Sequence, residues 1–445
     1  MRSKISNRLK KYFDRPSLLL LLLPYIVITF NDIKSSADFS FPYFLLSVLV
    51  VFILDILFCL LYYKFDKKWQ QLIFNAIYAT FFVFFYGYFF TAPLLYIRGR
   101  FLMLIYWLVV FCIVSWIKLA RQFLNRLAIV FCAIIVCTLL YNSKFDNYKA
   151  SFYSAPGSVK IAKQSNKPIV LIILDEYSSP VELKKNGLFS GYPDLAGYLD
   201  TNGWIVNRRS YSFETSTIHS ISSLYNNNLS RSGNYGDTKI FKVISYLNQA
   251  NVIRSLYSKG VKFKNYSFFS IASVPYYKYL YEFPSRPYEL FLINSLYLHI
   301  KVGVEDFATQ AFLPNNYPTA NYNKDIYNKL NQLLEQPAVA KQFVYLHFWM
   351  PHDPIEFGDE IALKPYSAAN YYKYWLFANN KIITALSKAK HLTDYRIIIS
   401  GDHGYRDDQK IDAHQTMTAF YGFDKNDVEK LHCVQDIGTL IEQSF

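Results

Sequence analysis

The chain has 445 residues, of which 52% are hydrophobic and 19% aromatic, and its formal net charge at pH 7 is +14. This length and apolar content exclude a single small soluble domain. An excess of Lys and Arg fits some nucleic-acid-binding proteins, but the sequence contains no recognisable nucleic-acid-binding module and no basic face interleaved with aromatic residues. Nucleic acid is therefore not expected as a partner. We expect the basic residues to set membrane topology and to lie beside anionic lipid.

The N-terminal third is a series of apolar runs that follow the basic start MRSKISNRLKKYFDR. Several of them approach the ~20 residues that a helix needs to cross the hydrocarbon core of a bilayer. The runs are roughly Ser17–Phe30, Tyr43–Tyr63, Leu72–Ala92, Phe101–Ile117 and Leu127–Tyr141. No small-residue cleavage site follows the first run, so we interpret it as a retained helix rather than a signal peptide. The sequence predicts a multi-span α-helical membrane domain of about five helices over residues 1–141.

The basic residues between these runs predict the orientation of the membrane domain. Those on one side are Arg2, Lys4, Arg8, Lys10, Lys11, Arg15, Lys64, Lys67, Lys68, Lys118, Arg121 and Arg126. The other side has only Lys34, Arg98 and Arg100. Because basic loops stay in the cytoplasm, we expect a multi-pass protein of the cytoplasmic (inner) membrane with a cytoplasmic N-terminus. The part that follows the fifth span is then extracytoplasmic, or periplasmic.

The exported part begins with a polar linker, residues 142–167, and continues as a domain over residues 168–445. Expected strands are PIVLIIL, WIVNRRSY, KFKNYSFFSI, FVYLHFW and YRIIISG. Helical spacing separates them in Phe241–Lys259, Lys324–Leu334 and Tyr371–Ala389. Strands that alternate with helices predict an α/β domain with a mostly parallel central sheet.

Acids and histidines follow three of the expected strands. IVLIIL ends in Asp175 and Glu176, RIIISG ends in Asp402 and His403, and FVYLHFW runs into His352. An acid after a strand is often a helix cap, and Asp-His-Gly can form an ordinary turn. Ligands of such sheets, however, bind beyond the carboxyl ends of the strands. Carboxylate and imidazole groups suit zinc or manganese, so the pattern favours a metal site.

A hydroxyl-rich stretch, SFETSTIHSIS at Ser212–Ser222, supplies candidate nucleophiles for such a site. A threonine or serine hydroxyl is a poor nucleophile at neutral pH unless a base or a metal lowers its pKa. Next to a divalent metal, one such oxygen is suited to attack phosphorus. The combination predicts a covalent phosphoryl-transfer site, although the stretch alone does not select which hydroxyl reacts.

Four segments, in chain order, resemble the alkaline phosphatase superfamily in its sulfatase-like branch. They are LIILDEYSS, ETSTIHSIS, YLHFWMPHDP and IIISGDHG, and VQDIGTL resembles a closing element of the same family. The resemblance spans nearly all of Ile169–Leu440. With about five spans before it, the domain resembles the membrane-bound phospholipid head-group transferases of the lipoteichoic acid synthase or phosphoethanolamine transferase type. The implied fold is an α/β sulfatase-like, or alkaline phosphatase-like, domain.

The resemblance implies the metal ligands and the nucleophile. Asp175, with Glu176 beside it, matches the acidic end of the first strand, and Asp402 and His403 match the Asp-His pair. The family's nucleophilic threonine is followed three residues later by serine, which selects Thr217. These five residues would hold a zinc or manganese ion.

Two histidines resemble residues that bind substrate or assist the leaving group. They are His352, in the segment MPHDP, and His414, eleven residues after His403. His347, inside the strand FVYLHFW, is instead expected to pack or to bond within the sheet.

The implied activity is transfer of a phosphoethanolamine or phosphoglycerol group from a phospholipid donor to an envelope glycan or lipid, through a phospho-threonine intermediate. Sulfate ester hydrolysis is disfavoured because no Cys/Ser-x-Pro-x-Arg motif lies near Thr217. Cys433 is the only cysteine of the exported domain, so the disulfides usual in phosphoethanolamine transferases cannot form, and the head group stays open. The alternatives are a metal-dependent phosphodiesterase, phosphatase or sulfatase-like hydrolase, or a catalytically inactive membrane scaffold.

Overall fold

The structure is a computed structural model of the whole chain. In the N-terminal part it describes residues 21–22, 25–26, 49–57, 60–61, 68–91 and 107–113. In the C-terminal part it describes residues 165–188, 194–226, 243, 246–247, 249–277, 318–352, 355–358, 360–363 and 367–445. The predicted span Leu127–Tyr141 and most of the linker at 142–167 lie outside these ranges, and three other predicted spans are described only in part.

The chain divides into two compact units. The N-terminal unit comprises Met1–Ala150 and Pro284–Glu305, and the C-terminal unit comprises Ser151–Phe283 and Asp306–Phe445. The division at residue 150 falls inside the predicted linker. All the candidate site residues belong to the C-terminal unit.

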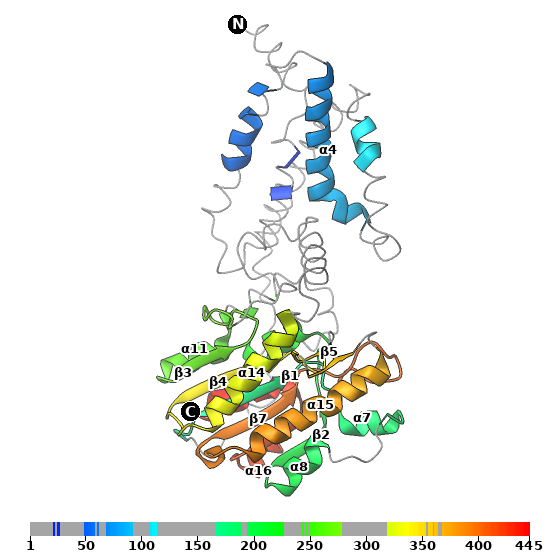
Figure 1. Cartoon of the computed structure of the whole chain (residues 1–445). Coiled ribbons are helices and arrows are strands. Elements are labelled where there is room, and N and C mark those ends of the chain that lie inside the picture. The colour runs from blue at the N-terminus through cyan, green and yellow to red at the C-terminus, as the bar shows by residue number, and fades with distance from the viewer. Residues whose placement is uncertain are drawn as a thin grey trace. The chain divides into compact units, whose positions relative to one another are not determined.

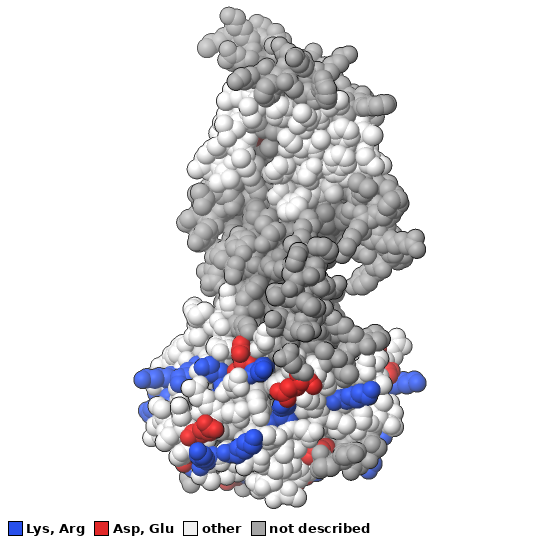
Figure 2. All heavy atoms as spheres, in the orientation of Figure 1, with Lys and Arg blue, Asp and Glu red and all other residues white. Residues whose placement is uncertain are grey.

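The N-terminal unit is described mainly through one long helix, α4 (Lys68–Thr91), which coincides with the predicted span Leu72–Ala92. Most of the exposed large hydrophobic side chains of the described residues lie in this unit, between Leu49 and Ile113. On the face shown in Figure 2, its described surface is almost entirely uncharged. Within the described ranges, no helix combines the length and the apolar character that a bilayer crossing requires.

The C-terminal unit contains a six-stranded sheet in the order β2-β8-β7-β1-β4-β3. The strands are β1 (Ile169–Leu174), β2 (Ile205–Tyr211), β3 (Lys262–Tyr266), β4 (Gln342–Phe348), β7 (Arg396–Gly401) and β8 (Gln415–Tyr421). The central strands β1, β4 and β7 are buried along their whole length. Their β-branched and aromatic runs are therefore those of strands covered on both faces.

The helices cover both faces of this sheet. One group is α8 (Leu195–Thr201), α14 (Pro318–Leu334) and α15 (Ala368–Ser387), which pack against one another. A second group is α9 (Thr217–Asn226), α11 (Asn251–Ser258) and α17 (Ile437–Gln443). In Figure 1, α14 and α15 cross the near face of the sheet. The remaining elements are α7 (Pro180–Lys185), α16 (Lys425–Val428), the short strands β5 (Ile355–Glu356) and β6 (Ala362–Leu363), and the 3₁₀ helices η3 (Leu392–Asp394) and η4 (Val434–Asp436).

The sheet is mixed, which refines the prediction of a mostly parallel one. β1 pairs in parallel with β4 and β7, and β3 pairs in parallel with β4. β8 runs antiparallel to both β7 and β2. All five strands expected from the sequence are present in this sheet, and its sixth strand, β8, was not expected. Its sequence, QTMTAFY, intersperses hydroxyl side chains among the apolar ones and lacks the continuous apolar run of the central strands.

Candidate active site

The carboxyl ends of β1 and β7 bring the predicted acids together. These strands pair in register, with Leu174 opposite Gly401, so the residues that follow them, Asp175 and Asp402, emerge side by side. The backbone N–H of Glu176 donates to Oδ1 of Asp402 at 2.9 Å, which ties the two strand ends together. The topology therefore brings the two acids to the same edge of the sheet, beyond the carboxyl ends of the strands.

Three residues form a compact set of potential metal ligands: Asp175, Asp402 and His403. Each offers one ligand atom, and these atoms all lie within 4.8 Å of one another. All three side chains are fully buried, and Oδ2 of both aspartates has no hydrogen-bond partner among the described residues. Buried carboxylate oxygens without partners are costly unless a cation occupies the space between them. The donor set of two carboxylates and one imidazole thus fits zinc or manganese.

The imidazole of His403 is already in the tautomer that a metal requires. Its Nδ1 lies 2.8 Å from the carbonyl oxygen of Gly404, which can only accept, so Nδ1 carries the proton. Nε2 then presents a lone pair toward the aspartates, 3.4 Å from Oδ2 of Asp402. Burial lowers the pKa of His403 to about 3, which keeps the ring neutral at physiological pH. Such a bond to the other ring nitrogen is the usual way in which a ligating histidine is oriented.

Metal affinity is expected to increase as the pH rises. Burial raises the pKa of Asp175 well above its usual value, and the neighbouring Asp402 raises it further; burial likewise raises the pKa of Asp402. Protons therefore compete with the metal at both carboxyls at a pH where ordinary acids are ionised, whereas His403 does not compete above its low pKa. Calorimetric titration with Mn²⁺ between pH 5 and 8 should show proton release and tighter binding at higher pH. An affinity that does not change with pH would contradict this electrostatic description.

Thr217 is the hydroxyl that the structure places at this cluster. It is the first residue of α9, and its side chain is buried. Its Oγ1 donates to Oδ1 of Asp175 at 3.1 Å and lies 3.3 Å from Nε2 of His403. The family spacing selected this residue from the six hydroxyls of the stretch, and its Oγ1 contacts two of the three cluster residues.

A second layer of hydrogen bonds holds the start of α9 against β7. Oγ of Ser220, one turn after Thr217, donates to the carbonyl oxygen of Asp402 at 2.9 Å. Nε2 of Gln435 donates to Oγ of both Ser220 and Ser212, at 3.0 Å each. These side chains are buried, so the position of the Thr217 hydroxyl relative to Asp402 is fixed by the surrounding protein.

Two glycines let β8 pass close behind the cluster. A Cβ at Gly401 would lie 2.0 Å from Oγ1 of Thr416, which itself donates to the carbonyl of Tyr177. A Cβ at Gly404 would lie 2.7 Å from the carbonyl oxygen of Gln415. The glycines of the segment IIISGDHG are therefore explained by close packing on both sides of the Asp-His pair.

The carboxylate of Glu176 does not join the three ligand residues. The backbone of Glu176 has a φ of 60°, in the left-handed region, while the carboxylate of Asp175 belongs to the cluster. Oε1 of Glu176 instead accepts from the backbone N–H of Arg406 at 3.0 Å and from its Nε at 3.2 Å. The prediction that Glu176 is a metal ligand stays a prediction, and its Oε1 is engaged by Arg406.

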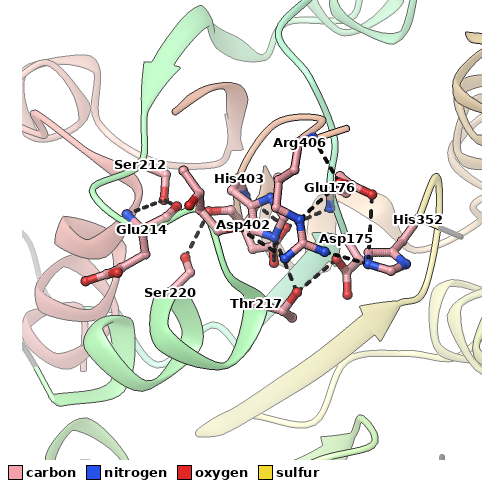
Figure 3. Close-up of polar contacts among 12 residues, drawn as sticks. Asp175, Glu176, Ser212, Glu214, Thr217, Ser220, His352, Asp402, His403 and Arg406 are labelled. Carbon is pink, nitrogen blue, oxygen red and sulfur yellow. Dashed lines mark hydrogen bonds and ion pairs between the residues drawn. The ribbon is translucent and has the colours of Figure 1, made fainter. Parts of the chain in front are cut away.

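Arg406 is a site residue that the sequence analysis did not select. Its guanidinium bonds to Glu176, its Nη1 donates to the carbonyl of Thr215 at 3.3 Å, and its Nη2 donates to Nε2 of His352 at 2.9 Å (Figure 3). His352 also stacks against Trp349, with ring centroids 4.4 Å apart. The predicted substrate histidine is thus at the site, held through an arginine. In the sequence, Arg406 could have been selected from its position, two residues after the Asp-His-Gly signature.

His414 has other partners. Its Nδ1 lies 2.7 Å from the carbonyl oxygen of Ser212, and its ring stacks on Tyr211 with centroids 5.3 Å apart. No hydrogen bond or ion pair joins it to the cluster within the described residues. Its predicted role in catalysis stays a prediction.

His347 borders the cluster from β4. Its Nδ1 lies 2.6 Å from the hydroxyl of Tyr345, as expected for a histidine bonded within the sheet. Its Nε2, however, faces Oδ2 of Asp175 at 3.5 Å. Burial lowers the pKa of His347 to about 4, so the ring is neutral at physiological pH. The sequence does not indicate this contact between His347 and Asp175, because it depends on the register in which β4 pairs with β1.

Comparison with solved structures finds similar chains at low sequence identity. One is the integral membrane lipooligosaccharide phosphoethanolamine transferase A of Neisseria meningitidis, with 14% identity and a TM-score of 0.40, over 94% of this chain and 90% of that one. Another is the lipoteichoic acid synthase LtaP of Listeria monocytogenes, with 15% identity and a TM-score of 0.37, over 67% and 76%. A third is a protein in the alkaline phosphatase superfamily from Vibrio parahaemolyticus, with 13% identity and a TM-score of 0.34, over 62% and 66%.

No protein-family model matches the chain, and no curated protein matches it.

Proposed function

We propose that this protein is a membrane-anchored, metal-dependent transferase that moves a phosphorylated head group from a phospholipid to an envelope glycan or lipid. The observation that carries the proposal is the hydroxyl of Thr217, which contacts Asp175 and His403 within a buried set of metal-type ligands. A hydroxyl held against such a set is suited to nucleophilic attack on phosphorus. The chain therefore acts through a covalent intermediate on Thr217.

The metal would be held by Asp175, Asp402, His403 and the hydroxyl oxygen of Thr217. When bound, a zinc or manganese ion supplies positive charge that lowers the pKa of the threonine hydroxyl and offsets charge on the phosphoryl oxygens. The atoms that would bind it are Oδ2 of Asp175 and Oδ2 of Asp402, which have no hydrogen-bond partner among the described residues.

The reaction has two steps, both at Thr217. In the first, Oγ1 loses its proton and bonds to phosphorus, while the bond from phosphorus to the diacylglycerol oxygen breaks and that oxygen takes up a proton. In the second, an oxygen of the acceptor hydroxyl or phosphate bonds to the same phosphorus and gives up any proton that it carries, while the bond from phosphorus to Oγ1 breaks and Oγ1 takes up a proton. α9 begins at Thr217, so the positive end of its dipole favours the negative group that is bound there. His352 lies beside Glu176, where we place proton exchange with the departing or entering oxygen.

The N-terminal unit supports a donor that resides in a bilayer. Its described side chains expose a series of large apolar residues between Leu49 and Ile113, which water would not favour. Lipid contact accounts for this exposure. An anchored site is then held close to its phospholipid substrate in the outer leaflet of the cytoplasmic membrane.

The experiment that tests the proposal incubates the full-length chain with short-chain phospholipids of different head groups. The donors are phosphatidylethanolamine and phosphatidylglycerol, with phosphatidylcholine as a comparison. Intact-mass measurement should detect an increase equal to one phosphorylated head group, and peptide mapping should locate it on Thr217. The head group that accumulates identifies the donor.

Three outcomes decide between the alternatives. An adduct on Thr217 that passes to an added glycan or lipid acceptor supports the transferase. Steady release of the head group to water without any modified acceptor indicates a hydrolase. The absence of both adduct and release, with metal bound and all donors tested, would leave the inactive scaffold.

A further inference from the structure

Arg406 stands at the open side of the buried ligand set. Its side chain is 36% exposed, whereas that of its partner Glu176 is 2% exposed. Burial tends to lower the pKa of Arg406, but the surrounding acids, led by Glu176 and followed by Asp175 and Asp402, raise it overall. Its charge is therefore permanent and lies within the electrostatic field of the cluster. In Figure 3 the side chain reaches over the site from the loop that follows His403.

Each of the three guanidinium nitrogens of Arg406 makes one hydrogen bond, which leaves two N–H groups without a bond within the described residues. Nε bonds to Glu176, Nη1 to the carbonyl of Thr215 and Nη2 to Nε2 of His352. These bonds use three of its five N–H groups, and within the described residues the other two have no protein acceptor. Each Nη thus retains one N–H that a phosphate oxygen can accept, and a planar guanidinium is suited to binding phosphate through paired N–H groups.

Glu176 explains why this arginine is held in place. Its carboxylate receives both the backbone N–H and Nε of Arg406, so backbone and side chain are fixed by one acid. The backbone of Glu176 is itself tied to Oδ1 of Asp402. The acid next to the first ligand therefore couples the guanidinium to the metal-type cluster without belonging to it.

We propose that Arg406 binds the nonbridging oxygens of the phosphoryl group that Thr217 attacks, and that Glu176 is the anchor of Arg406 rather than a metal ligand. The ligand class is a phosphate ester anion, and the binding group is the guanidinium fork. Arg406 exchanges its bond to His352 for bonds to phosphate, which leaves Nε2 of His352 able to accept a proton from an alcohol. This inference rests on the proposed function and adds the residue that recognises the phosphate.

Phosphate binding and metal content together test the proposal. The full-length chain in nonionic detergent is loaded with Mn²⁺ and titrated calorimetrically with inorganic phosphate, and its metal content is measured by mass spectrometry. Arg406→Ala should weaken phosphate binding by about 10- to 100-fold, because charge-assisted hydrogen bonds are lost. Arg406→Lys should weaken it by about tenfold, because the charge remains but the fork does not.

Glu176 provides the second arm of the test. Glu176→Gln should retain the bound metal, whereas Asp175→Asn should lose it. If Glu176→Gln loses the metal as Asp175→Asn does, the anchor assignment is wrong. Arg209→Ala is the matched control, because this exposed arginine bonds to Gln415 and should bind phosphate like the wild type.

The results separate this inference from the proposed function. If both Arg406 variants melt like the wild type and bind phosphate equally tightly, Arg406 is not the phosphate residue, whatever occurs at Thr217. If the metal-loaded wild type binds no phosphate at all, the inference also fails. A missing adduct on Thr217, with phosphate binding that depends on Arg406, would instead count against the proposed covalent step.

Discussion

Replacing Thr217 with alanine is expected to lower turnover by about 10⁴-fold or more and to abolish the covalent adduct, because the attacking oxygen is removed. Thr217→Ser should keep part of the activity, since it retains a hydroxyl at the same position. Steady-state head-group transfer and intact-mass detection of the adduct provide the two measurements. Three cluster residues remain in both variants, so each should still bind metal, although more weakly.

Ser222→Ala is the matched control for this substitution. Ser222 lies on the same helix and is also buried, but its hydroxyl bonds to the carbonyl of Val243. Its loss should leave the adduct and the rate close to those of the wild type. An adduct that persists in Thr217→Ala would show that another side chain is the nucleophile and would remove the basis of the proposed mechanism.

Asp402→Asn is expected to have opposite effects on stability in the absence and presence of metal. Without metal at neutral pH, the variant should melt at a higher temperature, because it removes one of two adjacent buried carboxyls. Oδ1 of an asparagine can still accept from the backbone N–H groups of Glu176 and His403, so the local structure is kept. With metal in large excess, the wild type should gain about 4 kcal/mol, a gain that the variant should largely lose.

The pH dependence of the melting temperature independently predicts whether the metal-free Asp402→Asn variant is more or less stable than the metal-free wild type. The pKa values of Asp175 and Asp402 are raised by burial, so the folded state holds protons that the unfolded state has released. Their contribution to stability is present below the unfolded pKa and is lost as the pH rises through the raised values. Thermal melts of metal-free wild type and Asp402→Asn should therefore diverge as the pH rises. Curves that stay parallel would contradict the assignment of buried, coupled carboxyls.

The central strands and the acids that follow them could be predicted because their signals are local. β1, β4 and β7 contain short continuous apolar runs, which are typical of strands buried on both faces. Acids that follow such strands are brought to one edge by topology alone, and this rule placed Asp175 and Asp402 together. The selection of Thr217 needed more than a local signal, since the stretch offers six hydroxyls and the family spacing made the choice.

The rest could not be predicted because it depends on pairings between distant segments. Arg406 and Glu176 are 230 residues apart in sequence, and neither residue type reveals the other. The acid next to Asp175 therefore resembled a second ligand. β8 was missed for a related reason: its hydroxyls face partners such as Ser210 in β2, which makes it look polar in isolation.

The reversal of β8 has a consequence for how the site is assembled. Because β8 returns beside β7, residues 402–414 form a single loop whose two ends are held by neighbouring strands, and the N–H of Gly404 donates to the carbonyl of Ala413 across it. This one short segment carries His403, Arg406 and His414. The proposed metal ligand His403 and the proposed phosphate-binding residue Arg406 are thus carried by one segment, and backbone pairing between its two ends sets their separation.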